Sequence, residues 1–267
     1  MTPAPLLRPY PRTSPSETAR NVLFFPHSGG SPASYQDLSA ALSHSGEVNT
    51  AAVHYPGRAE RCREPFFTSV HALADQVADA LPAWADSRPT LLFGHSLGAV
   101  IAYETIRRLP ASGNLFLVAS GCPAPSWPSP PLLDDRPEGL DERVAQVVRE
   151  LDGQAAEMLD HPVLSQMFLP VIRADLLAYH RYRPDPGSVI ECPVVGLRGH
   201  DDARTPTSAM RAWARHTRGG FRLHGFPGGH FFVRDHARPI AEILRAAVHE
   251  CDVASLRTSS FRTPWMV

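Results

Sequence analysis

Short apolar runs alternate with amphipathic stretches along most of the chain. The runs are typical of strands that are buried on both faces. Between them, apolar residues recur at helical spacing, as in Val70, Leu73, Val77 and Leu81, and again in 240–248 near the C-terminus. The predicted strands are 22–25, 50–53, 91–93, 115–120, 194–198 and 221–223. This alternation predicts an α/β fold, with a mostly parallel central sheet and helices on both faces.

One long interval does not follow this alternation of strand and helix patterns. About 70 residues separate Ser120 from Pro193, whereas a single crossover helix needs far fewer. The first part is rich in proline, and two amphipathic patterns follow, the second with a kink expected at Pro170. Because the strand pattern resumes afterwards, we favour a helical lid inserted at about 122–190 over a separate domain. The predicted organisation is a flexible N-terminal tail at 1–20, one domain at 21–250 and a C-terminal tail at 251–267.

Composition narrows the function classes. The 267-residue chain has a formal net charge of −1, whereas nucleic-acid binders need a basic excess. It contains no apolar run of about 18 residues and no recognisable secretory signal, so neither a membrane span nor export is expected. All 26 basic residues are arginine, which excludes chemistry that depends on a lysine. Four widely separated cysteines argue against a zinc site or a disulfide framework, so we expect a cytoplasmic protein without a metal.

The central chemical signal is the pentapeptide Gly94-His95-Ser96-Leu97-Gly98, which has the pattern GxSxG. The bare pattern is weak, but its context strengthens it. An apolar strand pattern precedes the pentapeptide and a helical pattern follows it, as a nucleophilic serine on a sharp turn requires. The helix N-terminus also favours developing negative charge. Ser96 is therefore the predicted nucleophile.

A serine nucleophile needs a base and a carboxylate that orients the base. His230 is the preferred base because it lies in a glycine-rich loop between the last predicted strand and the final helix. His224 and His236 are its competitors. The carboxylate is expected after a strand, between the serine and the histidine in chain order. Asp202 and its neighbour Asp201 both meet that condition, and Asp202 is preferred.

The charge that develops on the attacked carbonyl oxygen needs an oxyanion hole. One donor is expected to be the N–H of Leu97, directly after the nucleophile. The other is expected from the loop after the first predicted strand of the domain, where small residues let the backbone approach a substrate closely. We predict the N–H of Ser28 for this role and expect His27 to shape the loop.

Seven sets of residues, taken in order, resemble one family, the type II thioesterases of polyketide and nonribosomal peptide biosynthesis. The resemblance covers about residues 20 to 250 and is specific only when the sets are taken together. They are Phe25-Pro26-His27-Ser28-Gly29-Gly30; Tyr55-Pro56-Gly57-Arg58 with Arg61 and Glu64-Pro65; Gly94-His95-Ser96-Leu97-Gly98; Ser120-Gly121 with Ala124-Pro125; Leu169-Pro170 with Arg173-Ala174-Asp175; Gly199 with Asp202; and Phe226-Pro227-Gly228-Gly229-His230-Phe231.

The resemblance implies an α/β-hydrolase fold and a serine hydrolase that acts on thioesters. Ser96, Asp202 and His230 fall on the family's triad positions, and 122–190 falls on its mobile lid. The implied activity of a stand-alone thioesterase is to remove acyl groups from the phosphopantetheine arms of acyl or peptidyl carrier proteins. That activity edits mis-primed or stalled chains. No cofactor is implied, because the phosphopantetheine belongs to the substrate.

Two departures from the family pattern concern the surroundings of the triad. Cys122 stands near the place where family members often carry a basic residue, and Ser28 stands where alanine is common. Both changes are outside the triad, and both can alter the acyl pocket or the docking of a carrier protein.

Further contacts with substrate are predicted at His27, Gly29 and Phe231. Apolar lid residues, Met158, Met167 and Phe168, are candidates to line an acyl tunnel. An acidic carrier protein would favour a basic rim around the entrance. The candidates for that rim are Arg58, Arg61, Arg136, Arg143 and Arg173. We expect a monomer whose partner is the carrier domain and which binds neither nucleic acid nor membrane.

Three other functions share this sequence pattern, because a fold does not determine a reaction. A small-molecule serine esterase would use the same triad without preferring carrier-bound thioesters. An acyltransferase or cyclase would pass the acyl group to an alcohol or amine instead of water. A catalytically silent scaffold would only bind a partner.

Overall fold

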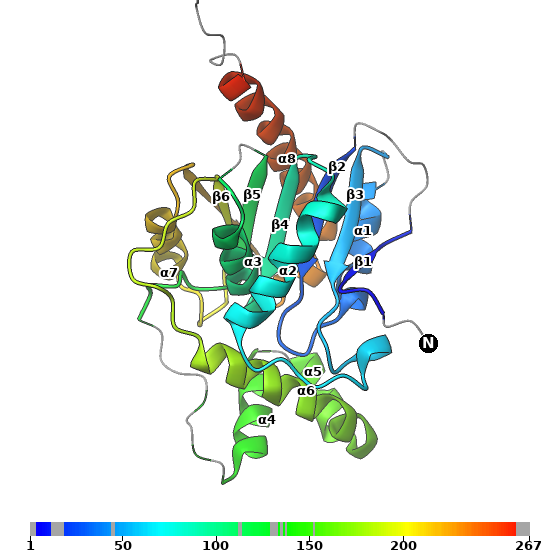
Figure 1. The fold of residues 1–267 in the computed structure, drawn as a ribbon. Helices are drawn as coiled ribbons and strands as arrows, with labels where there is room; N and C mark the ends of the chain where they lie inside the picture. Colours follow the sequence, from blue (N-terminus) through cyan, green and yellow to red (C-terminus); the bar gives the residue numbers. More distant parts are fainter. Residues whose placement is uncertain are drawn as a thin grey trace, which may run out of the picture.

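A seven-stranded sheet forms the centre of the molecule (Figure 1). The structure is a computed structural model, and it describes residues 4–11, 19–43, 46–111, 114–128, 133, 136, 138–151 and 153–259, without the side chains of 153–155 and 251–259. The strand order is β1-β3-β2-β4-β5-β6-β7. Strands β2 to β7 pair in parallel, and β1 pairs with β3 in the antiparallel sense.

All six predicted strands are confirmed; one has the predicted bounds, and the other five extend outward by a few residues. They are β2 (Arg20–Phe25), β3 (Val48–Val53), β4 (Thr90–His95), β5 (Leu115–Ser120), β6 (Val194–Gly199) and β7 (Phe221–Phe226). Strands β2 to β5 are buried almost throughout, so they are apolar on both faces. Such strands lie in the middle of a sheet that helices cover on both sides.

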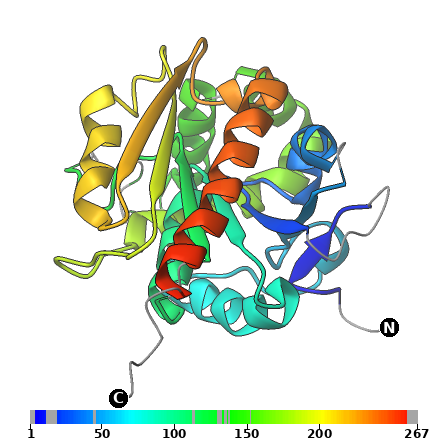
Figure 2. The same ribbon diagram turned by 90° about the horizontal axis from the view of Figure 1, so that it is seen from above.

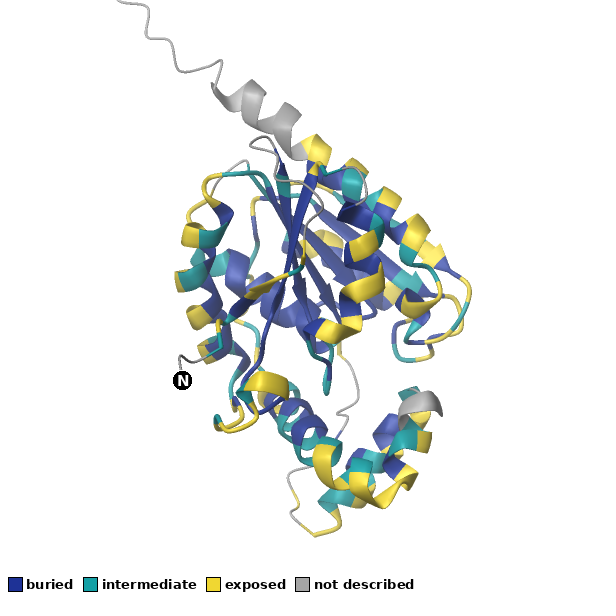
Figure 3. Cartoon of the chain, turned by 90° about the vertical axis from the view of Figure 1, so that its right-hand side faces the viewer, coloured by how far each residue is buried: buried dark blue, intermediate teal, exposed yellow. Residues whose placement is uncertain are grey.

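Two pairs of helices cover the two faces of the sheet, and together they confirm the predicted fold class. One core cluster joins Val22 and Phe24 of β2 to α1 (Gln36–Ser43) and α8 (Ala237–Ser259). The other joins Leu23 and Phe25 to α2 (Val70–Ala85) and α3 (Leu97–Arg108). Successive strand residues point to opposite faces, which explains the division. Figure 2 shows α8 crossing the strands, and Figure 3 shows the buried strands between the helices.

The lid lies between β5 and β6 in the sequence, at the end of the sheet where Ser96 follows β4 (Figure 1). It consists of α4 (Leu140–Leu151), α5 (Gly153–Asp160) and α6 (Pro162–Arg181). A separate apolar cluster holds it together, including Val144 and Val147 of α4 and Leu176 of α6. The predicted helical insertion is thus present, and α6 continues as a helix through Pro170.

Part of the segment that was predicted as a loose tail forms a strand. Leu7–Pro9 forms β1, and Leu7 is buried against the core. The Leu6 carbonyl accepts a hydrogen bond from the His54 N–H at 2.7 Å. The prediction missed this strand because a three-residue edge strand with two exposed side chains leaves no apolar pattern. At the other end, α8 continues to Ser259, past the predicted boundary at 250, and residues 260–267 lie outside the described part.

The remaining elements are short. They are η1 (Pro32–Tyr35), η2 (Ala59–Arg61), α7 (Thr207–Arg211), η3 (Ala212–His216) and η4 (Phe232–Arg234). None of the helices described is long and apolar enough to cross a membrane.

Candidate active site

Ser96 lies on a tight turn between β4 and α3. Its backbone has φ 54° and ψ −125°, a conformation that residues with a side chain rarely adopt. A Cβ at Gly94 would lie 2.3 Å from the Gly98 carbonyl oxygen, and a Cβ at Gly98 would lie 2.0 Å from the Phe25 carbonyl oxygen. Only glycine fits at these two positions, which explains the GxSxG spacing. The turn leaves Ser96 partly exposed at the N-terminus of α3.

Asp202 and His230 form the predicted acid–base pair. His230 Nδ1 lies 2.8 Å from Asp202 Oδ2, and the two residues are 7% and 4% exposed. A carboxylate can only accept, so Nδ1 carries the proton and Nε2 is left as the basic nitrogen. Asp202 follows β6, and His230 follows β7, the neighbouring parallel strand. The ends of these two strands therefore bring together residues that are 28 positions apart.

Hydrogen bonds hold the Asp202 carboxylate in its charged form. Burial raises the pKa of Asp202, but hydrogen bonds from His230, Thr205 and the Arg204 N–H outweigh it and leave that pKa below its ordinary value of 3.8. Thr205 Oγ1 donates to Oδ2 at 2.6 Å, and the Arg204 N–H donates to Oδ1 at 3.0 Å. The carboxylate is thus anionic at neutral pH and is oriented by three donors.

The structure distinguishes the residues that the sequence left as alternatives for the carboxylate and for the base. Asp201 is exposed, so it does not take the place of Asp202. His236 Nε2 lies 3.0 Å from the Pro227 carbonyl oxygen, and His224 lies on β7. Neither histidine lines a cavity beside Ser96, whereas His230 lines both cavities described below.

His95 lies directly behind the pair and is fully buried. Its ring centroid is 5.1 Å from that of His230, and its Nδ1 lies 3.0 Å from Ser120 Oγ. Burial, followed by the nearby His230 and His27, lowers the pKa of His95 well below its ordinary value. His95 is therefore a neutral residue whose ring packs against that of His230.

The predicted oxyanion loop forms a turn beside Ser96. The Gly30 N–H donates to the His27 carbonyl oxygen at 2.9 Å, and Gly29 has φ +78°. Leu97 is the first residue of α3, so its N–H has no partner within the helix. Backbone hydrogen bonds among the described residues likewise leave the Ser28 N–H unused. Both predicted donors are thus available.

Two cavities meet at Ser96 and His230. The smaller, of about 250 Å³, is mainly apolar and lies under the lid. The larger, of about 710 Å³, extends to the other side of Ser96. Leu151 and Tyr179 of the lid line both cavities, so they stand where the two meet. No hydrogen bond joins Ser96 to His230 in the described structure, and such bonds often align only when a substrate binds.

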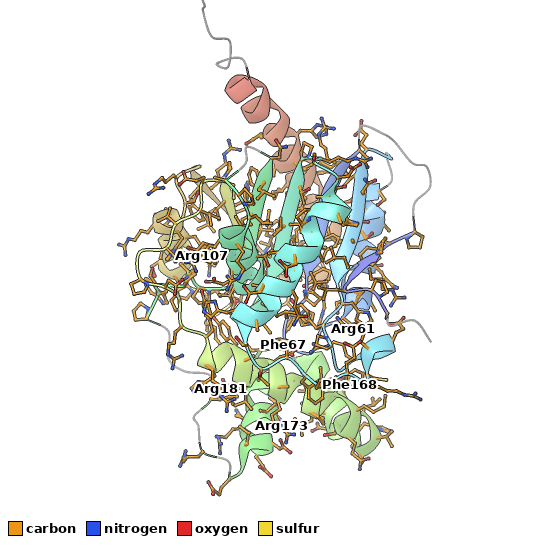
Figure 4. All side chains as sticks on the ribbon, viewed as in Figure 1. Arg61, Phe67, Arg107, Phe168, Arg173 and Arg181 are labelled. Atoms are coloured by element: carbon orange, nitrogen blue, oxygen red, sulfur yellow. The ribbon has the colours of Figure 1, made fainter. Side chains whose placement is uncertain are left out.

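The smaller cavity contains most of the predicted substrate contacts. His27, Gly29 and Phe231 line it together with Phe168 and Met158 of the lid. Met167 was predicted wrongly, because it is 62% exposed and lies outside both linings. Successive residues on a helix point about 100° apart, so Phe168 faces the cavity while Met167 faces solvent. Figure 4 labels Phe168 on the lid.

The structure also locates Cys122 and three of the arginines that were candidates for a basic rim. Cys122 lines the larger cavity, and burial raises the pKa of its thiol to about 12, so the thiol is uncharged at neutral pH. Arg58 was proposed for the basic rim, but its side chain is buried and paired with Asp175. Arg61 is only partly buried and pairs with Glu64, while Arg173 pairs with Asp141.

Sequence reasoning missed two residues of the site. The Thr205 hydroxyl donates a hydrogen bond to Asp202. The only local sign of this role in the sequence was a threonine three residues after an aspartate at the end of a strand. Tyr179 of α6 lines both cavities, and a tyrosine near the end of a helical pattern gives no local sign of that position. Within the described part of the chain, no group of three His, Cys, Asp or Glu side chains could hold a metal ion.

The chain is similar to known thioesterases. A family model for the thioesterase domain matches residues 20–248. A probable cadicidin biosynthesis thioesterase of Streptomyces griseus is 35% identical over 241 residues, which are 89% of this chain and 65% of that protein. The chain therefore spans slightly less than two thirds of that relative. Thioesterase PikA5 of Streptomyces venezuelae is 35% identical over 222 residues, with 82% of this chain and 77% of that protein covered.

A solved structure shows the same architecture. The type II thioesterase BorB from the borrelidin biosynthetic cluster has a TM-score of 0.74 and 33% sequence identity. The match covers 91% of this chain and 96% of that one.

Proposed function

Because the chain belongs to the thioesterase domain family, we propose that it is a type II thioesterase of polyketide or nonribosomal peptide assembly. Its proposed substrates are acyl groups joined by a thioester to the phosphopantetheine arm of an acyl or peptidyl carrier protein. Release of mis-primed or stalled chains is the proposed purpose. The observation that carries this proposal is the Asp202–His230 pair beside Ser96, at the junction of two cavities.

The two cavities suit the two parts of such a substrate. A carrier-bound thioester has an acyl chain on one side of its carbonyl carbon and a long pantetheine arm on the other. The smaller apolar cavity under the lid suits the acyl chain, and the larger one suits the arm. Ser96 and His230 line both cavities, which supports a position for the carbonyl carbon where the cavities meet.

The reaction proceeds in two halves. His230 Nε2 accepts the Ser96 proton as Oγ attacks the thioester carbonyl carbon, and the N–H groups of Leu97 and Ser28 stabilise the oxyanion. The carbon–sulfur bond then breaks, and the departing sulfur leaves as a thiol with the proton from His230. Water attacks the acyl-enzyme next, again with His230 as the base, and releases a carboxylic acid. Asp202 stabilises the imidazolium throughout. The chemistry requires no cofactor beyond the substrate's own arm.

The test is a paired assay of wild type and Ser96→Ala. A carrier protein is loaded with an acetyl or propionyl pantetheine thioester, and hydrolysis is followed by intact-protein mass spectrometry beside a matched oxygen ester. Wild type is expected to cleave the thioester in preference to the ester, and Ser96→Ala to cleave neither above background. Cleavage of the ester with an untouched carrier would instead establish a general esterase. Transfer of the acyl group to an added alcohol or amine would establish an acyltransferase.

A second pair of variants tests the carboxylate. Asp202→Asn is expected to lower kcat by about 10³- to 10⁴-fold, because it disturbs the histidine tautomer. Asp201→Asn is the matched control and is expected to retain wild-type kcat, because its side chain is exposed. Equal losses in both variants would contradict the assignment.

A further inference from the structure

A buried ion pair joins the lid to the body of the molecule. Asp175 of α6 is fully buried, and Arg58, just after β3, has 5% of its side chain exposed. Arg58 Nη1 and Nη2 each donate to one oxygen of the Asp175 carboxylate at 2.7 Å. The guanidinium also lies 5.2 Å from the ring centroid of Tyr55 and 5.9 Å from that of Phe67. Figure 4 labels Phe67 between the sheet and the lid.

Asp175 and Arg58 also form hydrogen bonds with the oxyanion loop, at two points. The Gly29 N–H donates to Asp175 Oδ2 at 2.8 Å, and Arg58 Nη1 donates to the Gly30 carbonyl oxygen at 3.1 Å. Ile172 of α6 adds a close contact, since a Cβ at Gly29 would lie 2.6 Å from Ile172 Cγ1. Charge-assisted hydrogen bonds of this kind are short and directional. Helix α6 therefore contacts the loop through packing and through fixed polar bonds.

These bonds select one form of the turn at His27–Gly30. The turn is closed between His27 and Gly30, and φ of +78° at Gly29 is the signature of a type II turn. A flip of the central peptide to the type I form would reverse the Gly29 N–H. The Ser28 carbonyl would then face the buried Asp175 carboxylate, and two acceptors would lie together without a proton between them. Asp175 therefore stabilises the observed form.

We propose that Arg58 and Asp175 form a positioning pair. Through this pair, lid helix α6 holds in place the turn that presents the Ser28 N–H to the oxyanion. The inference rests on the serine-hydrolase function proposed above. The pair touches neither Ser96 nor His230, so it acts through the turn. An oxyanion donor must lie about 2.7–3.1 Å from the developing charge, and misplacement by about 1 Å costs roughly a hundredfold in rate.

The first test is Asp175→Asn, which keeps the shape of the side chain and removes its charge. We expect kcat on the carrier-bound thioester to fall about 10- to 100-fold, with KM close to wild type, because the oxyanion donor acts mainly in the transition state. The pH dependence of kcat/KM should keep its midpoint, since His230 and Asp202 are unchanged. Asp141→Asn is the matched control: it removes a 2.9 Å pair with Arg173 of the same helix and should retain wild-type kcat.

A double-mutant cycle with Ser28→Pro separates positioning from general stability. Proline has no N–H and is favoured at the second position of a type II turn, so this variant deletes the proposed donor and keeps the turn. If Asp175 acts through that N–H, adding Asp175→Asn to Ser28→Pro should lower kcat by less than about threefold. A merely structural role predicts the same 10- to 100-fold loss in both backgrounds.

Thermal denaturation of every variant identifies loss of folding, and Arg58→Lys provides a second route if Asp175→Asn does not fold. Lysine keeps the charge but cannot form the bidentate hydrogen bonds of arginine to Asp175, so kcat should fall less than for Asp175→Asn. Addition of Arg58→Lys to Ser28→Pro should again cause little further loss of kcat. Wild-type kcat in folded Asp175→Asn, or equal losses in both backgrounds, would overturn the positioning role alone. An inactive wild type would overturn the proposed function together with it.

Discussion

Ser96 occupies a backbone conformation that costs of order 1–3 kcal/mol for a residue with a side chain. Its neighbours compensate for that strain. The Ser96 N–H donates to the Ser120 carbonyl oxygen at 2.8 Å, and the Ser96 carbonyl oxygen accepts from the Ala99 N–H at 2.9 Å. Gly94 and Gly98 allow the close approaches that the turn requires. The short motif thus contains both the strained residue and the glycines that make its conformation possible.

His95 shows how a residue inside the motif ties folding to pH. It is fully buried, and its Nε2 has no hydrogen-bond partner among the described residues. Protonation would place an unpaired N–H and a charge in the interior, which explains the lowered pKa of His95. The unfolded chain has no such restriction and takes up the proton below about pH 6.5.

We predict that His95 makes the protein less stable in mild acid. Its pKa is lower in the folded than in the unfolded state, so its contribution to stability is present above pH 6.5 and is lost as pH falls below that value. His95→Asn can keep a hydrogen bond to Ser120 but does not titrate. Its melting temperature should therefore fall less than that of wild type between about pH 8 and pH 5.5. Parallel curves for the two proteins would contradict this account.

At the scale of elements, α6 presents two different sides. Phe168, Ile172 and Leu176 lie about one turn apart and line the smaller cavity, and Asp175 is buried as well. Val163 and Met167, also one turn apart, are exposed to solvent. One helix thus anchors the lid through Asp175, shapes the cavity through Phe168 and forms part of the outer surface.

We predict that Phe168 limits the length of the acyl chain. Phe168→Ala enlarges the smaller cavity, so kcat/KM for a hexanoyl thioester relative to a propionyl thioester should rise about tenfold, because a few methylenes gain apolar contact. Met167→Ala is the matched control on the neighbouring, exposed position and should leave the ratio unchanged. Competition between the two loaded carrier proteins, read by mass spectrometry, measures the ratio directly. A similar rise in the Met167 variant would contradict the role of Phe168.

At the scale of the whole molecule, the two ends of the chain contribute differently to the fold. The N-terminal segment adds β1 to the sheet edge, buries Leu7 and lets Tyr10 donate a hydrogen bond to the Pro32 carbonyl oxygen. At the other end, the buried α8 side chains of the described structure lie between Ile240 and Val248.

We predict opposite results for two truncations. Removal of residues 2–11 should lower the free energy of unfolding by at least about 2 kcal/mol, through the lost burial of Leu7 and the lost strand pairing. A chain that ends at Glu250 keeps every described buried residue of α8 and should melt close to the full chain. Chemical denaturation of the three proteins measures both effects. A stable chain without residues 2–11 would show that β1 is dispensable.

Local patterns in the sequence predicted what depends on local physics. Fully apolar strands, helical spacing and the glycines around Ser96 each reflect contacts within a few residues, so six strands, the helices α2, α3 and α8 and the lid were predicted from them, whereas α1 was not. The three-residue β1 has too few apolar positions to produce such a pattern. The same limit explains Met167 and Phe168, since a helical pattern indicates a buried face but not its exact edge.

The chain itself therefore determined the order of elements, the strained turn at Ser96 and the candidates for base and carboxylate. The tertiary structure added the contact that distinguishes the preferred candidates from the others, because the ends of β6 and β7 bring Asp202, and not Asp201, to His230. Only the tertiary structure shows that Arg58 of the body pairs with Asp175 of the lid, because the two residues are 117 positions apart in the chain. Long-range pairing depends on how strands and helices pack, and packing leaves no signal in the spacing of neighbouring residues.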